Sequence, residues 1–327
     1  MVRWRVDAAA EVSRATAASA QQAFAARVRP RGRLPPSSAG IPALLNPDSG
    51  SAARARAALY ADGRFRVQEL TPTQVGDAVR AEVSRGTRRL LVSGGDGTLS
   101  AALGAAAGTG LEIAVFPGGT LNHFARDAGI PLDDPAAALD IAATGTPRPV
   151  DLGYVNGHAI LNTSSLGLYT EFVRRREYLE RWLNYRLASV AAAAAVWHDR
   201  QVVDVDIDTG GGARRRFRTP LVFVGIHERI LVPAGLGMRR PGGARALHVL
   251  VVQAPAPLRI RRLAFQPPGR GLQGLVPEKA VETYLTSKAT VEMAGAPALI
   301  AIDGELVQAT SPLHYELVPG AVTVVHR

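Results

Sequence analysis

Apolar runs alternate with amphipathic segments in the first half of the chain. Strand-like apolar runs fall at 41–46, 65–70, 88–93 and 111–116, and helix-like segments follow them at 51–63, 71–86, 99–108 and 121–129. Strands alternating with helices at this spacing predict right-handed crossovers and a parallel sheet covered by helices on both faces. We therefore expect a doubly wound α/β domain over residues 41–150, with ligands bound where the strands' carboxyl ends meet the following loops.

The pattern changes after Pro149. Two short strands joined at Asn156-Gly157 are followed by a long helical stretch over about 169–200, and then by strand-like runs almost to the end of the chain. This pattern predicts a C-terminal, largely antiparallel, β-sandwich-like domain over 151–310. We assign 311–327 to the first domain as a returning segment.

Length and composition agree with two globular domains. The chain has 327 residues, of which 47% are hydrophobic and 20% are charged, so it can bury a sizeable core. It has no cysteine, which excludes disulfides, thiolate zinc sites and a cysteine nucleophile. No apolar run is long enough to span a bilayer, and no secretory signal is visible. We expect a cytoplasmic protein, with peripheral association at the membrane left open.

Positive charge is concentrated at the N-terminus. The formal net charge is +10, and arginines crowd the first 33 residues. We interpret residues 1–40 as a flexible basic extension. A surface of this sign attracts phosphates, nucleotides or anionic lipid headgroups without choosing among them.

A first glycine turn, Ser93-Gly94-Gly95-Asp96-Gly97-Thr98, lies between a strand and a helix. Glycines let a phosphate chain approach the backbone, and free N–H groups at a helix start attract its charge. The turn lacks the lysine of a Walker loop, so backbone groups, an arginine or a metal must neutralise the phosphates. Asp96 would repel them unless Mg²⁺ or a substrate hydroxyl lies between. The alternative is a tight turn with an incidental aspartate.

A second glycine turn, at 116–122, follows the next predicted strand. Parallel neighbouring strands would bring this turn beside the first one. Thr120 either caps a helix starting at Leu121 or offers its hydroxyl to a phosphate, and Asn122 either binds a nucleotide or satisfies the helix start. Taken alone, capping is favoured for both residues. The two adjacent turns together favour a phosphate site.

A third motif, Ile302-Asp303-Gly304-Glu305-Leu306, lies between two strand-like runs of the second domain. Asp-Gly between apolar strands is a strong hairpin signal, which explains the motif without any function. Its functional interpretation is a pair of carboxylates at a reaction centre. One carboxylate would accept a proton from a hydroxyl while the other helps to hold Mg²⁺, as phosphoryl transfer requires.

Seven segments together resemble the diacylglycerol kinase catalytic-domain family, in the family's order. They are Asn46-Pro47-Asp48-Ser49-Gly50, GGDGT at 94–98, PGGTLNHFARDAGIP at 117–131, VDLG at 150–153, NTSSLGLYTEFV at 162–173, VFVG at 222–225 and AIDGE at 301–305. The chain is similar to the bacterial lipid kinases of that family, which also includes sphingosine and ceramide kinases. NAD kinases and phosphofructokinases are distant relatives. The resemblance covers about residues 41–325.

The resemblance implies ATP and Mg²⁺ as cofactors and a lipid alcohol as phosphate acceptor. The residues that match nucleotide-contacting positions are Asn46, Gly94, Gly95, Asp96, Gly97, Thr98, Gly119, Thr120 and Asn122. Asp96 and Glu305 are the candidates for holding the metal. Asp303 is the candidate base for the acceptor hydroxyl, and Asp96 is its rival for that role.

The chain departs from the family pattern at three places. Asn122 is followed by His123 where many members have aspartate; the stretch 224–230 reads VGIHERI; and the loop 236–247 has no acidic residue. We therefore expect no structural Mg²⁺ at 236–247.

The helix beginning near Tyr169 is the candidate membrane contact. It carries an apolar stripe at Phe172, Leu179, Leu183 and Val190 with arginines around it. This stripe either lies on an anionic membrane or packs on its own domain. Packing on its own domain is the commoner case.

The function expected from the sequence is an ATP- and Mg²⁺-dependent lipid kinase that phosphorylates diacylglycerol or a related lipid. The alternatives are a kinase of a soluble acceptor such as NAD or a sugar, and a catalytically silent nucleotide-binding relative. We expect a lipid substrate at the membrane surface and no nucleic-acid partner. A homodimer stays open.

Overall fold

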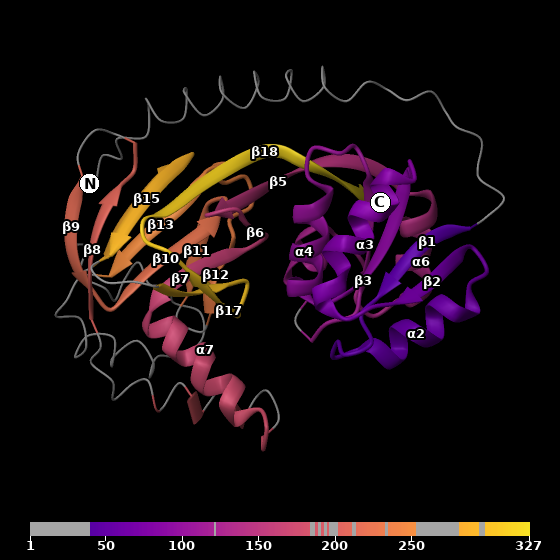
Figure 1. Ribbon diagram of the computed structural model, residues 1–327, viewed down its shortest axis with the longest axis horizontal. Coiled ribbons are helices and arrows are strands. Elements are labelled where there is room, and N and C mark those ends of the chain that lie inside the picture. Colours follow the sequence, from indigo (N-terminus) through magenta and orange to yellow (C-terminus); the bar gives the residue numbers. More distant parts are fainter. Residues whose placement is uncertain are drawn as a thin grey trace. The chain divides into compact units, whose positions relative to one another are not determined.

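The computed structural model describes residues 40–120, 122–183, 187–188, 191–192, 195, 202–210, 214–232, 235–252, 281–293 and 298–327. The expected extension at 1–40 lies outside the described residues except for Gly40, and Leu121 and Val190 also lie outside them. The chain divides into two compact units (Figure 1). One unit runs to Leu152 and includes Val318–Arg327, and the other comprises Gly153–Leu317. The domain limits expected from the sequence stay predictions.

The N-terminal unit is built on a parallel sheet. Its strands are β1 (Ile41–Leu45), β2 (Phe65–Glu69), β3 (Arg89–Gly94) and β4 (Glu112–Pro117), in the order β2-β1-β3-β4. The end of β18 (Leu313–His326) pairs with β4 in parallel, at Thr323 and Val324. Strand order reverses between β1 and β3, which is where ligands bind in open α/β sheets.

Five helices belong to this unit: α2 (Ala52–Ala61), α3 (Pro72–Ser84), α4 (Asp96–Ala106), α5 (His123–Asp127) and α6 (Pro135–Thr144). The pairs α2–α6 and α3–α4 pack together. Helix α6 is not among the predicted elements, although Asp134-Pro135 carries a helix-start signature. The Asp134 side chain accepts the Ala137 N–H at 3.0 Å, and Pro135 takes the first helical position. The doubly wound α/β class predicted from the sequence is confirmed.

The C-terminal unit consists of antiparallel strands packed in two layers. A six-stranded sheet has the order β14-β13-β10-β7-β16-β17, and β9, β8, β15 and the start of β18 form the other layer. Buried Leu166, Val224 and Val249 from the first layer and Ile207 and Val291 from the second share one core. The sandwich-like class is therefore confirmed. The bounds of these strands are β7 (Thr163–Gly167), β8 (Val203–Asp208), β9 (Arg215–Thr219), β10 (Leu221–Ile226), β13 (Leu247–Val252), β14 (Val281–Thr286), β15 (Lys288–Met293), β16 (Ala298–Ile302) and β17 (Glu305–Ala309).

Four further strands lie outside that sandwich. β5 (Thr146–Val155) pairs with β6 (His158–Ile160) across the predicted Asn156-Gly157 turn, and β5 also pairs with β18. β11 (Arg229–Val232) and β12 (Gly235–Arg239) form a two-stranded hairpin that the sequence analysis did not predict.

Helix α7 (Leu168–Leu179) packs against β7, β16 and β17 (Figure 1). It buries Thr170, Glu171 and Val173. The predicted helix reached Arg200, but most residues after Leu183 lie outside the described part of the chain. Within the described residues, no helix is both long and apolar enough to cross a membrane.

Candidate functional site: a glycine-lined cradle and an Asp-Gly hairpin

Three loops meet at the carboxyl ends of β1, β3 and β4. The Asn46 N–H donates to the Ser93 carbonyl at 2.9 Å, and the Gly118 N–H donates to the Gly94 carbonyl at 3.1 Å. The Asn46 amide group also donates to the Thr98 hydroxyl at 2.9 Å. The three predicted phosphate-binding segments of this unit are therefore joined. We call residues 46–50, 93–98, 118–120 and 122 the cradle.

Backbone approaches within the cradle are too close for larger residues. A Cβ atom on Gly119 would lie 2.5 Å from the Gly95 Cα, and one on Gly118 would lie 2.9 Å from the Gly94 nitrogen. A Cβ atom on Gly94 would lie 2.5 Å from the Thr98 Cβ. Gly95 differs, because a Cβ there would meet the Gly119 Cα at an ordinary contact distance of 3.5 Å. Packing therefore requires glycine at 94, 118 and 119 but not at 95.

Asn122 holds the second turn in place. Its side chain accepts the Gly119 N–H and donates to the Gly119 carbonyl, both at 2.8 Å. Asn122 is nearly buried and has a left-handed backbone with φ 49°. Its amide is thus used to shape the loop, which is neither of the two uses weighed from the sequence.

Asp96 caps α5, a role that the sequence analysis had considered for Thr120. The Asp96 carboxylate accepts the His123 N–H at 3.1 Å and the Phe124 N–H at 3.0 Å. The helix begins at His123 rather than at Leu121, and Thr120 lies against Gly50 instead. The capping interpretation of Thr120 is therefore wrong. These two donors fix the Asp96 carboxylate at the mouth of the first glycine turn.

The start of α4 carries no side-chain cap, because its N-cap residue is Gly95. The first N–H groups of a helix have no acceptor within the helix, so they are available to an anion. Ser93 adds a buried hydroxyl oxygen without a hydrogen-bond partner in the described structure. These features fit a phosphate chain approaching Gly95.

Asp303 and Glu305 lie in the other unit, on the hairpin that joins β16 to β17. Asp303 and Gly304 both have left-handed backbones, with φ 50° and 92°, as a two-residue hairpin turn requires. The Asp303 carboxylate accepts the N–H groups of Leu161, Asn162 and Thr163 at 2.8 to 2.9 Å. These three donors fix the orientation of the Asp303 carboxylate.

Helix α7 is fastened to the same hairpin. The Arg176 guanidinium donates to the Gly304 carbonyl at 3.1 Å and lies 3.5 Å from the Glu180 carboxylate. Burial raises the pKa of Glu177; Arg176 opposes that shift, while Glu180 and Glu305 add to it. Arg176 is not among the residues predicted from the sequence, since no spacing in the sequence links residues 176 and 304.

The two segments that depart from the family pattern, 224–230 and 236–247, pack against each other. Glu228 binds Arg240 at 2.7 Å and accepts the Ala244 N–H at 2.9 Å. Burial alone would raise the pKa of Glu228, but these two donors outweigh it and lower the pKa. Buried Arg229 donates to the carbonyls of Ile226 and Asn162. An arginine–glutamate pair thus joins the loop that lacks acidic residues to the neighbouring segment.

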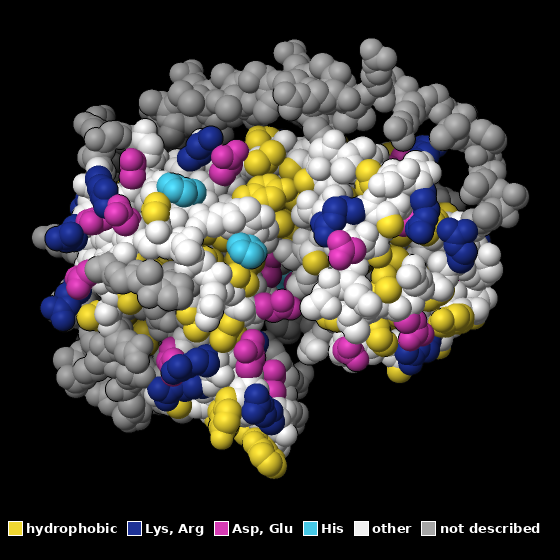
Figure 2. Space-filling model, viewed as in Figure 1, with side chains coloured by type: hydrophobic (Ala, Val, Ile, Leu, Met, Phe, Trp, Pro, Cys, Tyr) yellow, Lys and Arg dark blue, Asp and Glu magenta, His cyan; other side chains and the backbone are white. Residues whose placement is uncertain are grey.

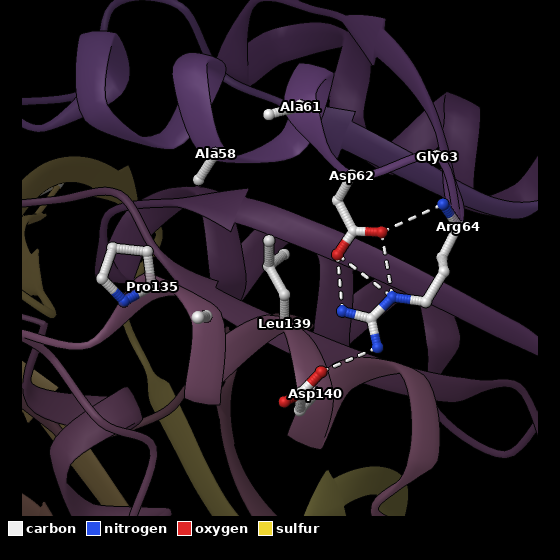
Figure 3. A pocket seen from close by; sticks show the side chains of 9 residues that line it. Ala58, Ala61, Asp62, Gly63, Arg64, Pro135, Leu139 and Asp140 are labelled. Carbon is white, nitrogen blue, oxygen red and sulfur yellow. Dashed lines mark hydrogen bonds and ion pairs between the residues drawn. The ribbon is translucent and has the colours of Figure 1, made fainter.

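A surface depression of the N-terminal unit lies apart from the cradle residues. It has a volume of about 460 Å³ and is lined by residues of α2 and α6, with Arg64 between Asp62 and Asp140 (Figure 3). Arg64 bonds Asp140 at 2.8 Å and Asp62 at 2.5 Å, and it lowers the pKa of Asp62. None of the predicted site residues lines this depression.

Asp96 is the carboxylate beside the cradle whose position fits a metal ion held together with phosphates. Among the described residues, no three His, Asp or Glu side chains gather closely enough to hold an ion. Mg²⁺ is commonly held by one or two carboxylates together with substrate phosphates. Asp96 beside the cradle fits that arrangement.

The region that holds the cradle resembles proteins of known family. Residues 42–155 match the model of the diacylglycerol kinase catalytic domain. A diacylglycerol kinase of Mycobacterium tuberculosis is 37% identical over 123 residues, which are 35% of this chain and 40% of the relative. A protein of Pseudomonas aeruginosa named "Probable lipid kinase YegS-like" is 47% identical over 97 residues, 28% of this chain and 32% of the relative.

The solved structures extend the likeness of fold to most of the chain. A diacylglycerol kinase from Bacillus anthracis superimposes with a TM-score of 0.62 at 18% identity, covering 88% of this chain and 97% of that one. The resemblance drawn from the sequence is confirmed, and the matched region carries the whole cradle. The sequence alignments span at most about 40% of these curated relatives.

Proposed function

We propose that the protein is an ATP- and Mg²⁺-dependent lipid kinase whose acceptor is diacylglycerol or a related lipid alcohol. The observation that supports this most is the cradle, whose glycine and amide contacts lie within the region that matches the diacylglycerol kinase catalytic domain. The relative from Mycobacterium tuberculosis is also named a diacylglycerol kinase.

In this proposal the cradle binds the nucleotide phosphates. The residues proposed for this nucleotide site are Asn46, Gly94, Gly95, Asp96, Gly97, Thr98, Gly119, Thr120 and Asn122. The uncapped start of α4 supplies N–H donors, and Gly95 lets the phosphates reach them. Asn46 and Asn122 act by holding the loops, as their hydrogen bonds indicate.

Three carboxylates are proposed to accept the proton of the acceptor hydroxyl and to bind the metal: Asp96, Asp303 and Glu305. Bound Mg²⁺ would neutralise the charge that spreads over the phosphate oxygens during transfer. Asp96 and Glu305 are its proposed protein ligands. Asp303 is the proposed base: it accepts the acceptor's hydroxyl proton as the hydroxyl oxygen bonds the γ-phosphorus and the bond to the ADP oxygen breaks. Asp96 is the rival, because each of its oxygens accepts one N–H and a carboxylate oxygen has two lone pairs.

Partition of labelled product tests the acceptor class. Purified protein is incubated with γ-labelled ATP, Mg²⁺ and a total lipid extract together with NAD and sugars, and label is counted in organic and aqueous phases. The proposal predicts label in the organic phase, lost in Asp96→Asn and Asp303→Asn and kept in the exposed control Asp133→Asn. Label found only in a water-soluble product would show that the acceptor is a soluble molecule and that the proposed lipid acceptor is wrong. Binding of ATP without transfer would make the protein a nucleotide-binding relative.

A further inference from the structure

Exposed apolar side chains concentrate at one end of α7. Among the described residues, nine large hydrophobic side chains are exposed, and four of them fall within ten consecutive positions: Tyr178, Trp182, Leu183 and Leu187. Trp182 is 81% exposed and Tyr178 63%. We call these four residues the apolar tip. Figure 2 shows hydrophobic side chains projecting at the far end of α7 with Lys or Arg side chains beside them.

The first part of the apolar tip is held on ordered backbone. The N–H groups of Trp182 and Leu183 both donate to the Leu179 carbonyl, at 3.0 and 2.9 Å. These bonds continue the last turn of α7, so Trp182 lies about one turn beyond Tyr178. The first half of the helix buries Thr170, Glu171 and Val173, while its far end exposes aromatic rings. Packing against the rest of the protein therefore explains the buried residues in the first half of the helix but not the exposed ones at its far end.

The chemistry of the apolar tip matches the interface of a lipid bilayer. Trp and Tyr favour the headgroup region, because their rings are apolar and carry a polar group at one edge. The Arg181 guanidinium lies over the Tyr178 ring, 5.8 Å from its centroid. Among the described residues Arg181 contacts no carboxylate, whereas Glu171 and Glu180 are bound by other arginines. An arginine beside aromatic rings that lie in the headgroup region can bind lipid phosphates.

The same helix leads to the candidate acceptor turn. Arg176 donates to the Gly304 carbonyl, beside Asp303, and lies about half a helical turn before Tyr178. A surface that binds the apolar tip would therefore be held at a fixed distance from the Asp303-Gly304 turn. This favours a bilayer over a protein partner, because the acceptor of the proposed function is dissolved in a bilayer.

We propose that the apolar tip of α7 is a docking surface for lipid bilayers that contain anionic lipid. The choice of a bilayer as the occupant rests on the proposed function. The exposed aromatic and leucine side chains enter the headgroup region, and Arg181 binds lipid phosphate there. Docking presents the Asp303-Gly304 turn to lipid alcohols in the membrane.

Vesicle binding without ATP tests the docking directly. Full-length protein is sedimented with vesicles of phosphatidylcholine, with and without phosphatidylglycerol. We expect binding that increases with phosphatidylglycerol and weakens about tenfold or more in Trp182→Ala. Tyr60→Ala is the matched control, since Tyr60 is 61% exposed but lies on α2, and it should bind as the wild type does. Equal binding by Trp182→Ala and the wild type, or no binding by the wild type, would overturn the docking proposal.

Fluorescence locates the tip itself. The other two tryptophans, Trp4 and Trp197, are replaced by phenylalanine so that Trp182 alone emits. Vesicles should shift its emission to the blue, and brominated lipid should quench it. Sedimentation without either change would overturn the proposal, as would a Trp182-dependent dimer without vesicle binding.

Diacylglycerol in vesicles and short-chain, dispersed diacylglycerol are used as two acceptors, so that failure of the docking proposal can be told from failure of the proposed function. If both hold, Trp182→Ala loses transfer to diacylglycerol in vesicles and keeps transfer to a short-chain, dispersed diacylglycerol. If the wild type transfers phosphate to neither form but still binds vesicles through Trp182, the kinase proposal fails and the docking proposal stands. If Trp182→Ala phosphorylates vesicle diacylglycerol as fast as the wild type does, the docking proposal fails.

Discussion

Replacing Gly119 by alanine tests whether the close approach of the two glycine turns is needed for nucleotide binding. The new Cβ would lie 2.5 Å from the Gly95 Cα, whereas carbon atoms in contact prefer about 3.5 to 4.0 Å. The two turns must therefore separate by roughly 1 Å. Overpacking of this kind costs about 1 to 3 kcal/mol. It also strains the bond between the Gly119 N–H and Asn122, so both stability and phosphate contacts should suffer.

Two other alanine substitutions make the test specific. Gly95→Ala fits the protein, because its Cβ meets the Gly119 Cα at 3.5 Å and the backbone at 95 is extended. It should therefore keep near-native stability while blocking the path of a phosphate to the helix start. Gly63→Ala meets nothing within 4 Å and should change neither property.

The assay pairs urea unfolding with titration of ATP into each variant. We expect Gly119→Ala to lose about 1 to 3 kcal/mol of unfolding free energy and at least roughly tenfold in ATP affinity. Gly95→Ala should lose affinity alone. Wild-type ATP affinity in Gly119→Ala, or in a stable Gly95→Ala, would refute the assignment of the cradle to phosphate binding.

Three further predictions concern stability. Asp303→Asn should lower the unfolding free energy by about 1 to 3 kcal/mol in urea titrations, since an amide removes an acceptor oxygen from three bound N–H groups, and an unchanged midpoint would contradict this. Arg89→Met should cost about 3 kcal/mol, because it removes a partner of buried Glu112 and the donor to three carbonyls at the end of α6; a cost below about 1 kcal/mol would contradict it. Burial lowers the pKa of His248 below 6.5, so the unfolded chain takes up the proton first and stability falls as pH drops through 6.5. His248→Asn, which keeps an acceptor for the Arg229 N–H, should flatten this slope between pH 7.5 and 5.5, and an unchanged slope would disprove the assignment to His248.

The sequence could predict the sheets because their signals are local and repeated. Strands β3 and β4 read as continuous apolar runs, since both faces of a parallel sheet are covered and their side chains are buried. The order of these runs also put the two glycine turns side by side, and the pairing of Gly94 with Pro117 confirms it. Helix α6 was missed although its Asp134-Pro135 start was visible in the sequence.

The partners of the site residues could not be predicted, because they are long-range contacts. Asp96 caps a helix that starts 27 residues later, and Asp303 binds N–H groups about 140 residues away. Spacing within a motif carries no information about such partners. Thr120 shows the resulting error, because it was the capping candidate nearest in sequence while Asp96 supplies the cap in space.

The balance between ADP released and phosphate recovered in lipid tests whether the protein is a lipid kinase. Full-length protein, Mg²⁺, γ-labelled ATP and vesicles containing diacylglycerol are incubated together, and ADP and labelled lipid are measured over time. We expect ADP and labelled lipid to appear in equal amounts, and Asp303→Asn to abolish both. ADP without labelled lipid, or labelled lipid formed equally well by Asp303→Asn, would contradict it.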